Sequence, residues 1–166
     1  MKKYIILFLL IIAFNSCQRD DICIDAITPH LIIRFYDNTD AESNKSVTDI
    51  QINIEGIDGN YIGDDINTTI TSSTDSIAIP LRTDQDFTNY ILTNNSLNED
   101  TKNSDTLTVT YNRQSIFVGR SCGYKDIFNN VNYTLSAKDT AYWIKGIEIV
   151  TQNIENETQA HVKIYH

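Results

Sequence analysis

Hydrophobic and polar side chains alternate with a period of two along much of this chain. The alternation is clearest in three segments, 49–55, 77–81 and 106–111. In the first, isoleucine occupies every second position between Asp, Gln, Asn and Glu, and in the third, Leu, Val and Tyr alternate with threonine. Such alternation predicts β-strands that bury one face. Pro80 falls where a strand end or a sheet edge tolerates proline.

Seven further segments are rich in the β-branched and aromatic residues that favour strands. They are Leu31–Tyr36, Thr68–Thr71, Asn89–Thr93, Ser115–Val118, Tyr133–Ala137, Trp143–Thr151 and Ala160–Tyr165. Clusters of Asn, Asp, Ser and Gly separate them, and no segment has a long helical stripe. The best short helix candidate is Tyr124–Asn129, one to two turns long. Short strands at near-regular spacing predict an all-β fold, an antiparallel β-sandwich with immunoglobulin-like or related Greek-key topology.

The beginning of the chain has a different pattern. Lys2 and Lys3 precede an apolar run from Tyr4 to Phe14, followed by Asn15, Ser16 and Cys17. The run is too short to span a bilayer as a helix, and its shape is that of a secretory signal. A cysteine at its end predicts a lipoprotein, in which cleavage leaves Cys17 to carry acyl chains such as palmitate. The alternative is an ordinary signal peptide with a chance cysteine.

These features predict three parts of the chain. Residues 1–16 are the lipoprotein signal peptide, residues 17–29 a lipid-anchored linker, and residues 30–166 a single β-sandwich domain. The stretch Gln18–Asp21 resembles a short acidic export tag that sends some Bacteroidota lipoproteins to the cell surface. A solvated linker would have the same composition. We expect an outer-membrane location, with the surface slightly favoured over the periplasmic side.

Charge excludes two classes of partner. Removal of residues 1–16 takes away Lys2 and Lys3, which leaves 11 basic and 22 acidic side chains and a formal net charge of −11. Nucleic-acid binding depends on Lys and Arg that neutralise phosphates, so we expect no nucleic-acid partner. The same balance argues against binding to anionic lipid through a broad basic patch.

Two cysteines remain besides Cys17, at positions 23 and 122. The cell envelope is oxidising, so we expect a Cys23–Cys122 disulfide that closes a loop of about 100 residues. Two free thiols, or a catalytic Cys122, are the alternatives.

The motifs that suggest chemistry have simpler explanations. Gly119–Gly123 matches the G-x-S-x-G pattern around Ser121, but the alternating β/α arrangement that a nucleophile elbow needs is missing. Asp58–Asp65 resembles part of a calcium loop, with Ile62 at a ligand position. No two of His30, His161 and His166 have metal-ligand spacing. We therefore expect no catalytic residue, no metal and no cofactor.

Two surface features remain open. Trp143, Tyr142 and Tyr133 offer an aromatic platform for a sugar, although core packing is the usual role of such residues in a sandwich. Asp-Ser-Ile and Asp-Thr-Leu or Asp-Thr-Ala triplets resemble the acceptor of Bacteroidota O-glycosylation, which makes Ser76, Thr106 and Thr140 candidate sites.

Three blocks of sequence together resemble a known family. They are His30–Asp37 following Cys23, the stretch Tyr111–Lys125 around Cys122, and Asn153–Glu157 leading to His161–Tyr165. The chain is similar, over nearly its whole mature length, to a family of small uncharacterised Bacteroidota lipoproteins with a domain of unknown function. The resemblance implies a lipoprotein with one β-rich domain and implies no activity. A gene for a predicted outer-membrane β-barrel protein often neighbours those of the family, which suggests a partner.

We therefore expect a non-enzymatic outer-membrane lipoprotein that acts as an envelope accessory or protein-interaction module, held to the membrane by its anchor. An outer-membrane β-barrel protein is the partner that the resemblance suggests. The alternative function is a surface module that binds a glycan or calcium. An enzyme using Ser121 or a pair of carboxylates is the third hypothesis.

Overall fold

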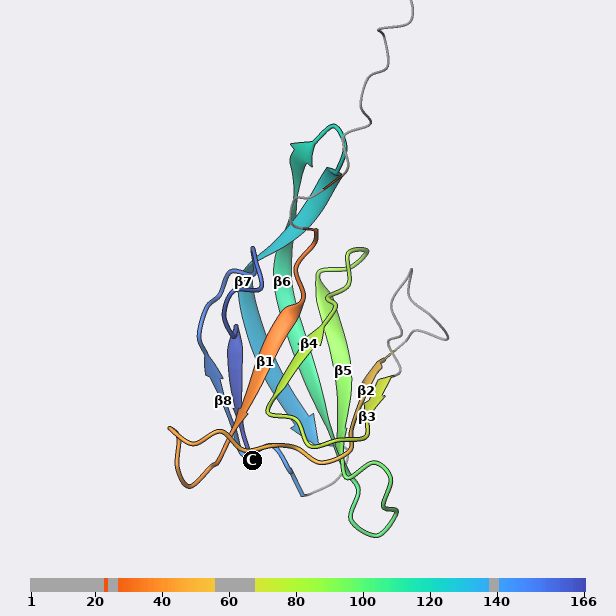
Figure 1. Ribbon diagram of the computed structural model, residues 1–166, viewed down its shortest axis with the longest axis vertical. Coiled ribbons are helices and arrows are strands. Elements are labelled where there is room, and N and C mark those ends of the chain that lie inside the picture. Colours follow the sequence, from red (N-terminus) through yellow and green to blue (C-terminus); the bar gives the residue numbers. More distant parts are fainter. Residues whose placement is uncertain (1–22, 24–26, 56–67, 138–140) are drawn as a thin grey trace, which may run out of the picture.

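The fold is a sandwich of two β-sheets, as a computed structural model that describes Cys23 and residues 27–55, 68–137 and 141–166 shows (Figure 1). Nine strands form among these residues: β1 (Leu31–Tyr36), β2 (Ile50–Ile54), β3 (Thr68–Ile70), β4 (Ser76–Ile79), β5 (Phe87–Asn94), β6 (Asn103–Gly119), β7 (Gly123–Ala137), β8 (Gly146–Ile149) and β9 (Val162–Tyr165). One sheet has the order β4-β1-β9-β8 and the other the order β3-β2-β5-β6-β7. No helix forms in these ranges. The predicted all-β sandwich is therefore confirmed.

The chain changes sheet after β1, β3, β4 and β7. All neighbouring strands run antiparallel except β1 and β9, which are parallel and pair Ile33 with Val162 and Tyr36 with Tyr165. Because β9 also pairs with β8, it lies inside the four-stranded sheet.

The core lies between the two sheets and is built from the alternating positions. In β2, for example, Ile50, Ile52 and Ile54 are all buried. Full burial of one such side chain stabilises the fold by roughly 1.5–3 kcal/mol. Trp143 closes one side of the core, where its Nε1–H donates to the Leu92 carbonyl at 3.0 Å.

Two sequence predictions about the β6–β7 region were wrong. Tyr124–Asn129 is not a helix but part of β7, and the predicted strands at 106–111 and 115–118 are one strand, β6. The physical reason is pairing. Ser115 faces Asp126 and Phe117 faces Tyr124 across the hairpin, so cross-strand hydrogen bonds fix an extended backbone in a segment too short to hold a helix alone.

Candidate functional site

The feature that distinguishes this sandwich is a long hairpin that extends beyond the body (Figure 1). Strands β6 and β7 have 17 and 15 residues, far longer than the other strands. We call residues 113–127 the arm. From Arg113 to Gly119 an extended strand rises about 20 Å. The arm therefore carries its turn well away from the core, at the end of the molecule opposite the β5–β6 loop.

A bulge marks the point where the hairpin leaves the sandwich. Thr110 pairs with Asn132 and Asn112 with Asn129, so one residue of β6 faces two of β7. The inserted Asn130 has φ +54°, in the left-handed region that Asn tolerates better than most residues. Such a bulge bends the strand and increases its twist, which directs the arm away from the sheet.

A disulfide joins the turn of the arm to the beginning of the described chain. Cys23 and Cys122 are bonded, with their Cα atoms 4.9 Å apart. Two further bonds hold the segment that follows. The Asp126 backbone N–H donates to Thr28 Oγ1 at 3.0 Å, and His30 donates its backbone N–H to Glu157 Oε1 at 2.7 Å. The N-terminal segment is thus fastened to the arm before it enters β1.

The tip of the arm exposes an aromatic pair. Phe117 is 60% exposed and Tyr124 is 72% exposed, although their rings contact each other edge to face with centroids 5.3 Å apart. Ile27, close in sequence to the disulfide, is 70% exposed. Phe117 and Tyr124 thus form an exposed apolar contact at the end of the arm, outside the core.

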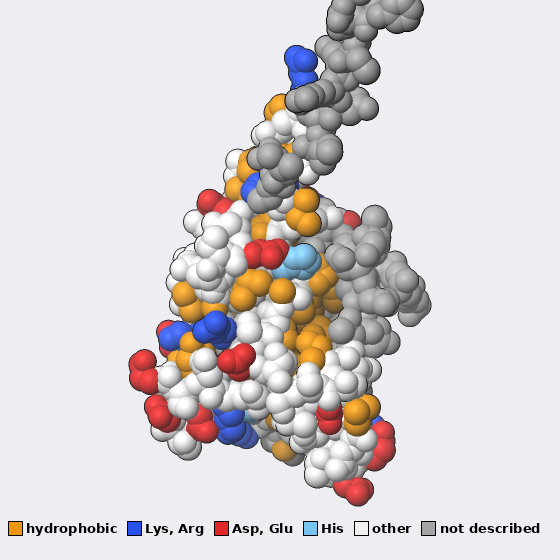
Figure 2. Space-filling view, in the orientation of Figure 1, with side chains coloured by type: hydrophobic (Ala, Val, Ile, Leu, Met, Phe, Trp, Pro, Cys, Tyr) orange, Lys and Arg blue, Asp and Glu red, His pale blue; other side chains and the backbone are white. Residues whose placement is uncertain are grey.

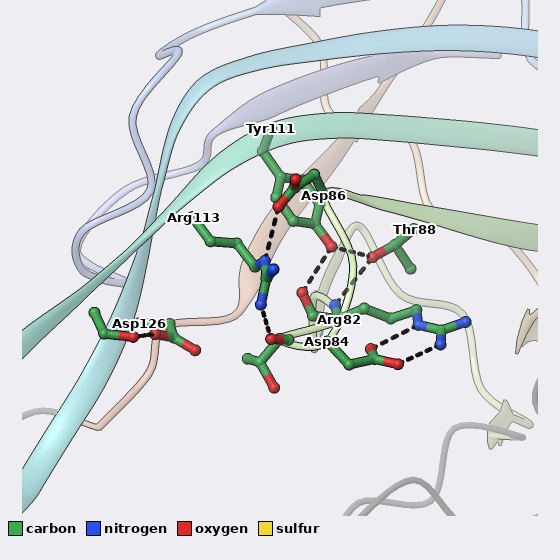
Figure 3. A network of polar contacts seen from close by, with 9 residues as sticks. Arg82, Asp84, Asp86, Thr88, Tyr111, Arg113 and Asp126 are labelled. Atoms are coloured by element: carbon green, nitrogen blue, oxygen red, sulfur yellow. Dashed lines mark hydrogen bonds and ion pairs between the residues drawn. The ribbon is translucent and has the colours of Figure 1, made fainter.

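The base of the arm is held by the loop between β4 and β5 (Figure 3). The Arg113 guanidinium donates to Asp86 Oδ1 at 2.9 Å and also to the Thr83 carbonyl. The hydrogen bond with Asp86 raises the pKa of Arg113, which therefore stays charged. Two residues further along β6 towards the tip, the Ser115 hydroxyl donates to Asp126 across the hairpin.

Tyr111 extends the same network into the core. Its hydroxyl donates to the Arg82 carbonyl at 2.8 Å and lies 2.7 Å from Thr88 Oγ1, which accepts the Arg82 backbone N–H (Figure 3). Its ring packs edge to face on Phe128, 4.9 Å between centroids. Buried hydroxyls satisfied in this way fix one arrangement of the loop. The arm is thus braced at its base rather than hinged.

A second surface feature is a shallow groove on the outer face of the four-stranded sheet. It has a volume of about 400 Å³, and its lining includes Arg34, Tyr36, Ser76, Glu157 and Lys163. Figure 2 views this side of the molecule and shows Lys and Arg side chains beside hydrophobic ones. The combination of cationic, hydroxyl and aromatic groups suits a polar ligand with an apolar face.

The floor of this groove is ordered by an ionic network. The Lys163 ammonium lies 3.0 Å from Glu148 Oε1 and 5.3 Å from the centre of the Tyr36 ring. Tyr165 donates its hydroxyl to Glu148 Oε2 at 2.5 Å. The hydrogen bonds from Tyr165 and Lys163 lower the pKa of the Glu148 carboxyl.

One of the three histidines, His161, has a structural role. His161 is buried, and its Nδ1 accepts the Ile32 backbone N–H at 2.9 Å. Nε2 therefore carries the proton and donates to the Asn156 carbonyl, also at 2.9 Å. Burial lowers the pKa of the imidazole. Both ring nitrogens are engaged by backbone, so His161 offers no base to Ser121, which lies exposed in the turn of the arm beside Cys122.

The described residues contain no group of three or more His, Cys, Asp or Glu arranged to hold a metal ion. The calcium-like loop Asp58–Asp65 lies outside them, as does Cys17, so calcium binding there and lipidation of Cys17 stay predictions. Within the same part of the chain, no helix is long and apolar enough to cross a membrane.

Trp143 packs in the core, the role usual for such residues in a sandwich, and so takes no part in an aromatic platform. Only 7% of Trp143 is exposed, because it packs against Phe35 and His166 with ring centroids 6.3 and 5.7 Å away. Tyr133 is half-buried, and burial raises the pKa of its phenol. Tyr142 alone of the three is exposed. Its neighbours leave no flat row of rings for a sugar.

Two of the three candidate glycosylation sites lie within strands. Ser76 begins β4 and is half-buried, with its hydroxyl donating to the Ile33 carbonyl at 3.3 Å. Thr106 is half-buried in β6, and Thr140 lies outside the described residues. Glycosylation at these positions stays a prediction.

Sequence reasoning missed the aromatic pair at the arm tip. A signal was present, because Gly119 and Gly123 flank a short turn between two segments of strand-like composition. A β-hairpin across this turn places Phe117 opposite Tyr124. The short helix assigned to Tyr124–Asn129 concealed that register.

Comparison with protein families assigns the greater part of the chain. Residues 50–166, which include the whole arm and both strands of its hairpin, match the model of a family of unknown function, DUF6452. The chain belongs to DUF6452. No curated protein and no solved structure matches the chain. The DUF6452 match begins at the first residue of β2, so Cys23 and β1 precede it. Both are nevertheless joined to residues that it covers, Cys23 by the disulfide to Cys122 and β1 by its pairing with β9.

Proposed function

We propose that this DUF6452 protein is a Bacteroidota lipoprotein of the outer membrane, anchored through acyl chains on Cys17, which acts without catalysis through contact with another envelope protein. An outer-membrane β-barrel protein is the partner we favour, and the cell surface is the side we favour. The sandwich is then a rigid body presented at the membrane.

One observation carries this proposal. The Cys23–Cys122 disulfide fastens the segment that begins six residues after Cys17 to the turn of the arm, and the arm is braced to the body by Arg113 and Tyr111. A domain that binds another protein while anchored by lipid needs a firm connection between its anchor and its body, and the disulfide and the braced arm supply that connection. The described residues contain no constellation of nucleophile, base and electrostatic stabiliser that would favour an enzyme.

Intact-mass measurement of the full chain, purified in detergent from its host, tests the anchor. We expect cleavage before Cys17 and the mass of the acyl chains on that residue. A Cys17→Ala variant should lose the acyl mass and leave the membrane fraction. Membrane association that is unchanged in this variant would contradict the proposal.

Site-specific photocrosslinking tests the protein contact. A photoreactive residue placed at Leu97, in the β5–β6 loop far from the arm, or at Ile149 of β8 should crosslink to one envelope protein in intact cells. The buried Ile144 is the matched position that should give no product. If neither exposed position returns an envelope protein, the interaction hypothesis is wrong.

The groove on the four-stranded sheet supports a second candidate function, the binding of a glycan. Tyr36 and Tyr165 lie side by side across β1 and β9, with ring centroids 6.0 Å apart, and Arg34 and Ser76 add polar groups. Binding of envelope polysaccharide that is lost in Tyr36→Ala and kept in Tyr142→Ala would support it. Equal binding by both variants, or none by the wild type, would count against it. A calcium-dependent rise in melting temperature would test the other ligand.

A further inference from the structure

We infer that the arm tip is a membrane-contact site, in which Phe117 and Tyr124 lie in the headgroup region of the lipid leaflet that holds the anchor. We define the arm tip as residues 117–124. This inference rests on the proposed lipidation of Cys17 and adds to it a second, non-covalent contact of the folded domain with lipid.

The length of the tether brings the arm tip to the membrane. Six residues lead from Cys17 to Cys23, and a fully extended chain of that length spans about 20 Å at most. The disulfide adds a Cα–Cα distance of 4.9 Å to Cys122 in the turn. The arm tip therefore cannot move far from the lipid surface, whatever conformation the tether adopts.

The opposite end of the hairpin is not restrained in this way. Strand β6 has 17 residues and extends about 50 Å from the β5–β6 loop to the tip. The anchor, the tether and the disulfide thus hold Phe117 and Tyr124 close to the lipid surface, and they do not hold the opposite end of the hairpin there.

The side chains at the arm tip suit a lipid headgroup region. Phe117 and Tyr124 are exposed, adjacent across the hairpin, and in edge-to-face contact. An aromatic ring with a polar tip is favoured at membrane–water interfaces, where its apolar body leaves water and its hydroxyl stays hydrated. Ile27, also largely exposed, adds apolar surface close in sequence to Cys23.

Charge is distributed in the sense that this contact requires. At or next to the arm tip lie two basic residues, Arg120 and Lys125, whereas Arg113 at the base of the arm is paired with Asp86. The arm has one carboxylate of its own, Asp126, which accepts a hydrogen bond from Ser115. The chain as a whole is acidic, and Figure 2 shows Asp and Glu side chains mainly towards the end opposite the arm. Basic side chains beside aromatic ones favour approach to phosphate groups, while an acidic far end favours solvent.

Tryptophan fluorescence tests the contact directly. The chain has one tryptophan, the buried Trp143, which gives a background signal shielded from lipid. The full lipidated Phe117→Trp variant is reconstituted into phosphatidylethanolamine–phosphatidylglycerol vesicles that contain a phospholipid brominated near its headgroup. We expect the added emission to be quenched by about half and shifted to shorter wavelength, as for an interfacial tryptophan. Tyr124→Trp should behave in the same way.

Leu97→Trp is the matched control, because Leu97 is equally exposed at 65% but lies in the β5–β6 loop at the far end. Its emission, and that of the wild type, should not change. If both tip variants float with the vesicles and remain unquenched, the anchor stands and the inference is wrong. If intact mass finds no acyl chain on Cys17, the proposed function fails and the inference fails with it.

Discussion

His161 illustrates how a single buried residue ties together distant parts of this chain. Its imidazole accepts a hydrogen bond from Ile32 in β1 and donates one to Asn156, while its own backbone N–H donates to the Ile32 carbonyl at 2.9 Å. Protonation would place a second proton on Nδ1, directed at the Ile32 N–H. The folded protein therefore favours the neutral ring, in agreement with the pKa that burial lowers.

This predicts a pH dependence of stability. The unfolded chain binds a proton at His161 near pH 6.5, whereas the folded chain does so only at lower pH. The free energy of unfolding should therefore be highest above pH 6.5 and fall as the pH drops below it. Urea unfolding between pH 7.5 and 5.5 measures the slope. Burial also lowers the pKa of His166, so His161→Gln should flatten the slope in part. A slope as steep as that of the wild type would contradict this assignment.

Asn130 gives a second prediction at a single position. Its φ of +54° at the bulge is unfavourable for a β-branched side chain, whereas Gly adopts it freely. Asn130→Val should lower the free energy of unfolding by roughly 1–2 kcal/mol, and Asn130→Gly should change it by a few tenths. Urea unfolding of both variants checks this. Equal effects of the two substitutions would show that the backbone conformation is not the cause.

Among the elements, the β6–β7 hairpin depends on contacts at its base. The Arg113–Asp86 ion pair is partly exposed, with 31% of the Arg113 side chain accessible. Such pairs contribute modestly to stability. The pair instead fixes the position of the arm, because it connects Arg113 in β6 to Asp86 in the loop between β4 and β5.

Arg113→Ala should therefore loosen the arm more than it destabilises the fold. We expect a loss of about 0.5–1 kcal/mol in the free energy of unfolding. Backbone amides of residues 113–127 should exchange hydrogen faster, while those of β5 keep their protection. Arg120→Ala, at the exposed tip, is the control that should leave both unchanged. Faster exchange throughout the sandwich would mean that the contact supports the core instead.

The strands of the sandwich body were predicted well from the sequence. Each buries one face, so hydrophobic and polar residues alternate along it. Ile50, Ile52 and Ile54 are an example. The prediction failed in the arm, where Ile127 alone of the described residues 113–127 is buried and residues such as Arg113, Gln114 and Ser115 are exposed. Without a buried face there is no period to detect, and strand character comes from cross-strand pairing alone. The strand order could not be predicted either, because β1 pairs with β9, a strand far from it in sequence.

For the candidate site, the cysteine count and the expected compartment were enough to predict the Cys23–Cys122 disulfide. The aromatic pair was missed because Phe117 and Tyr124 are seven positions apart in sequence and meet only through the hairpin register. The buried, structural role of His161 was not predicted, because sequence gives residue type and not burial. The groove around Lys163 depends on which strands neighbour β9, so it too required the structure.

At the scale of the whole molecule, the two ends differ in chemistry. The arm end has the disulfide, the exposed aromatic pair and most of its charge from Arg and Lys. The opposite end presents the β5–β6 loop, with Glu99 and Asp100 exposed. This polarity gives the proposed anchor one orientation of the body relative to the membrane.

The disulfide should contribute strongly to the stability of the whole domain. It links residues separated by 99 positions, and a loop of that length restricts the unfolded chain substantially. The Cys23→Ser, Cys122→Ser double variant should lose roughly 2–5 kcal/mol of unfolding free energy. Urea unfolding measures this, and a reducing agent should weaken the wild type to a similar extent. A loss below 1 kcal/mol would mean that the two segments are held together by their other contacts.

The interior position of β9 has a consequence for the order in which the molecule assembles. β1 is made early and finds its neighbour only in Val162–Tyr165, more than 120 residues later. A chain that emerges from a ribosome or a translocation channel in N-to-C order therefore holds β1 unpaired on that side until almost all of it has appeared. Completion of the four-stranded sheet is then a late event in folding, because it waits for β9.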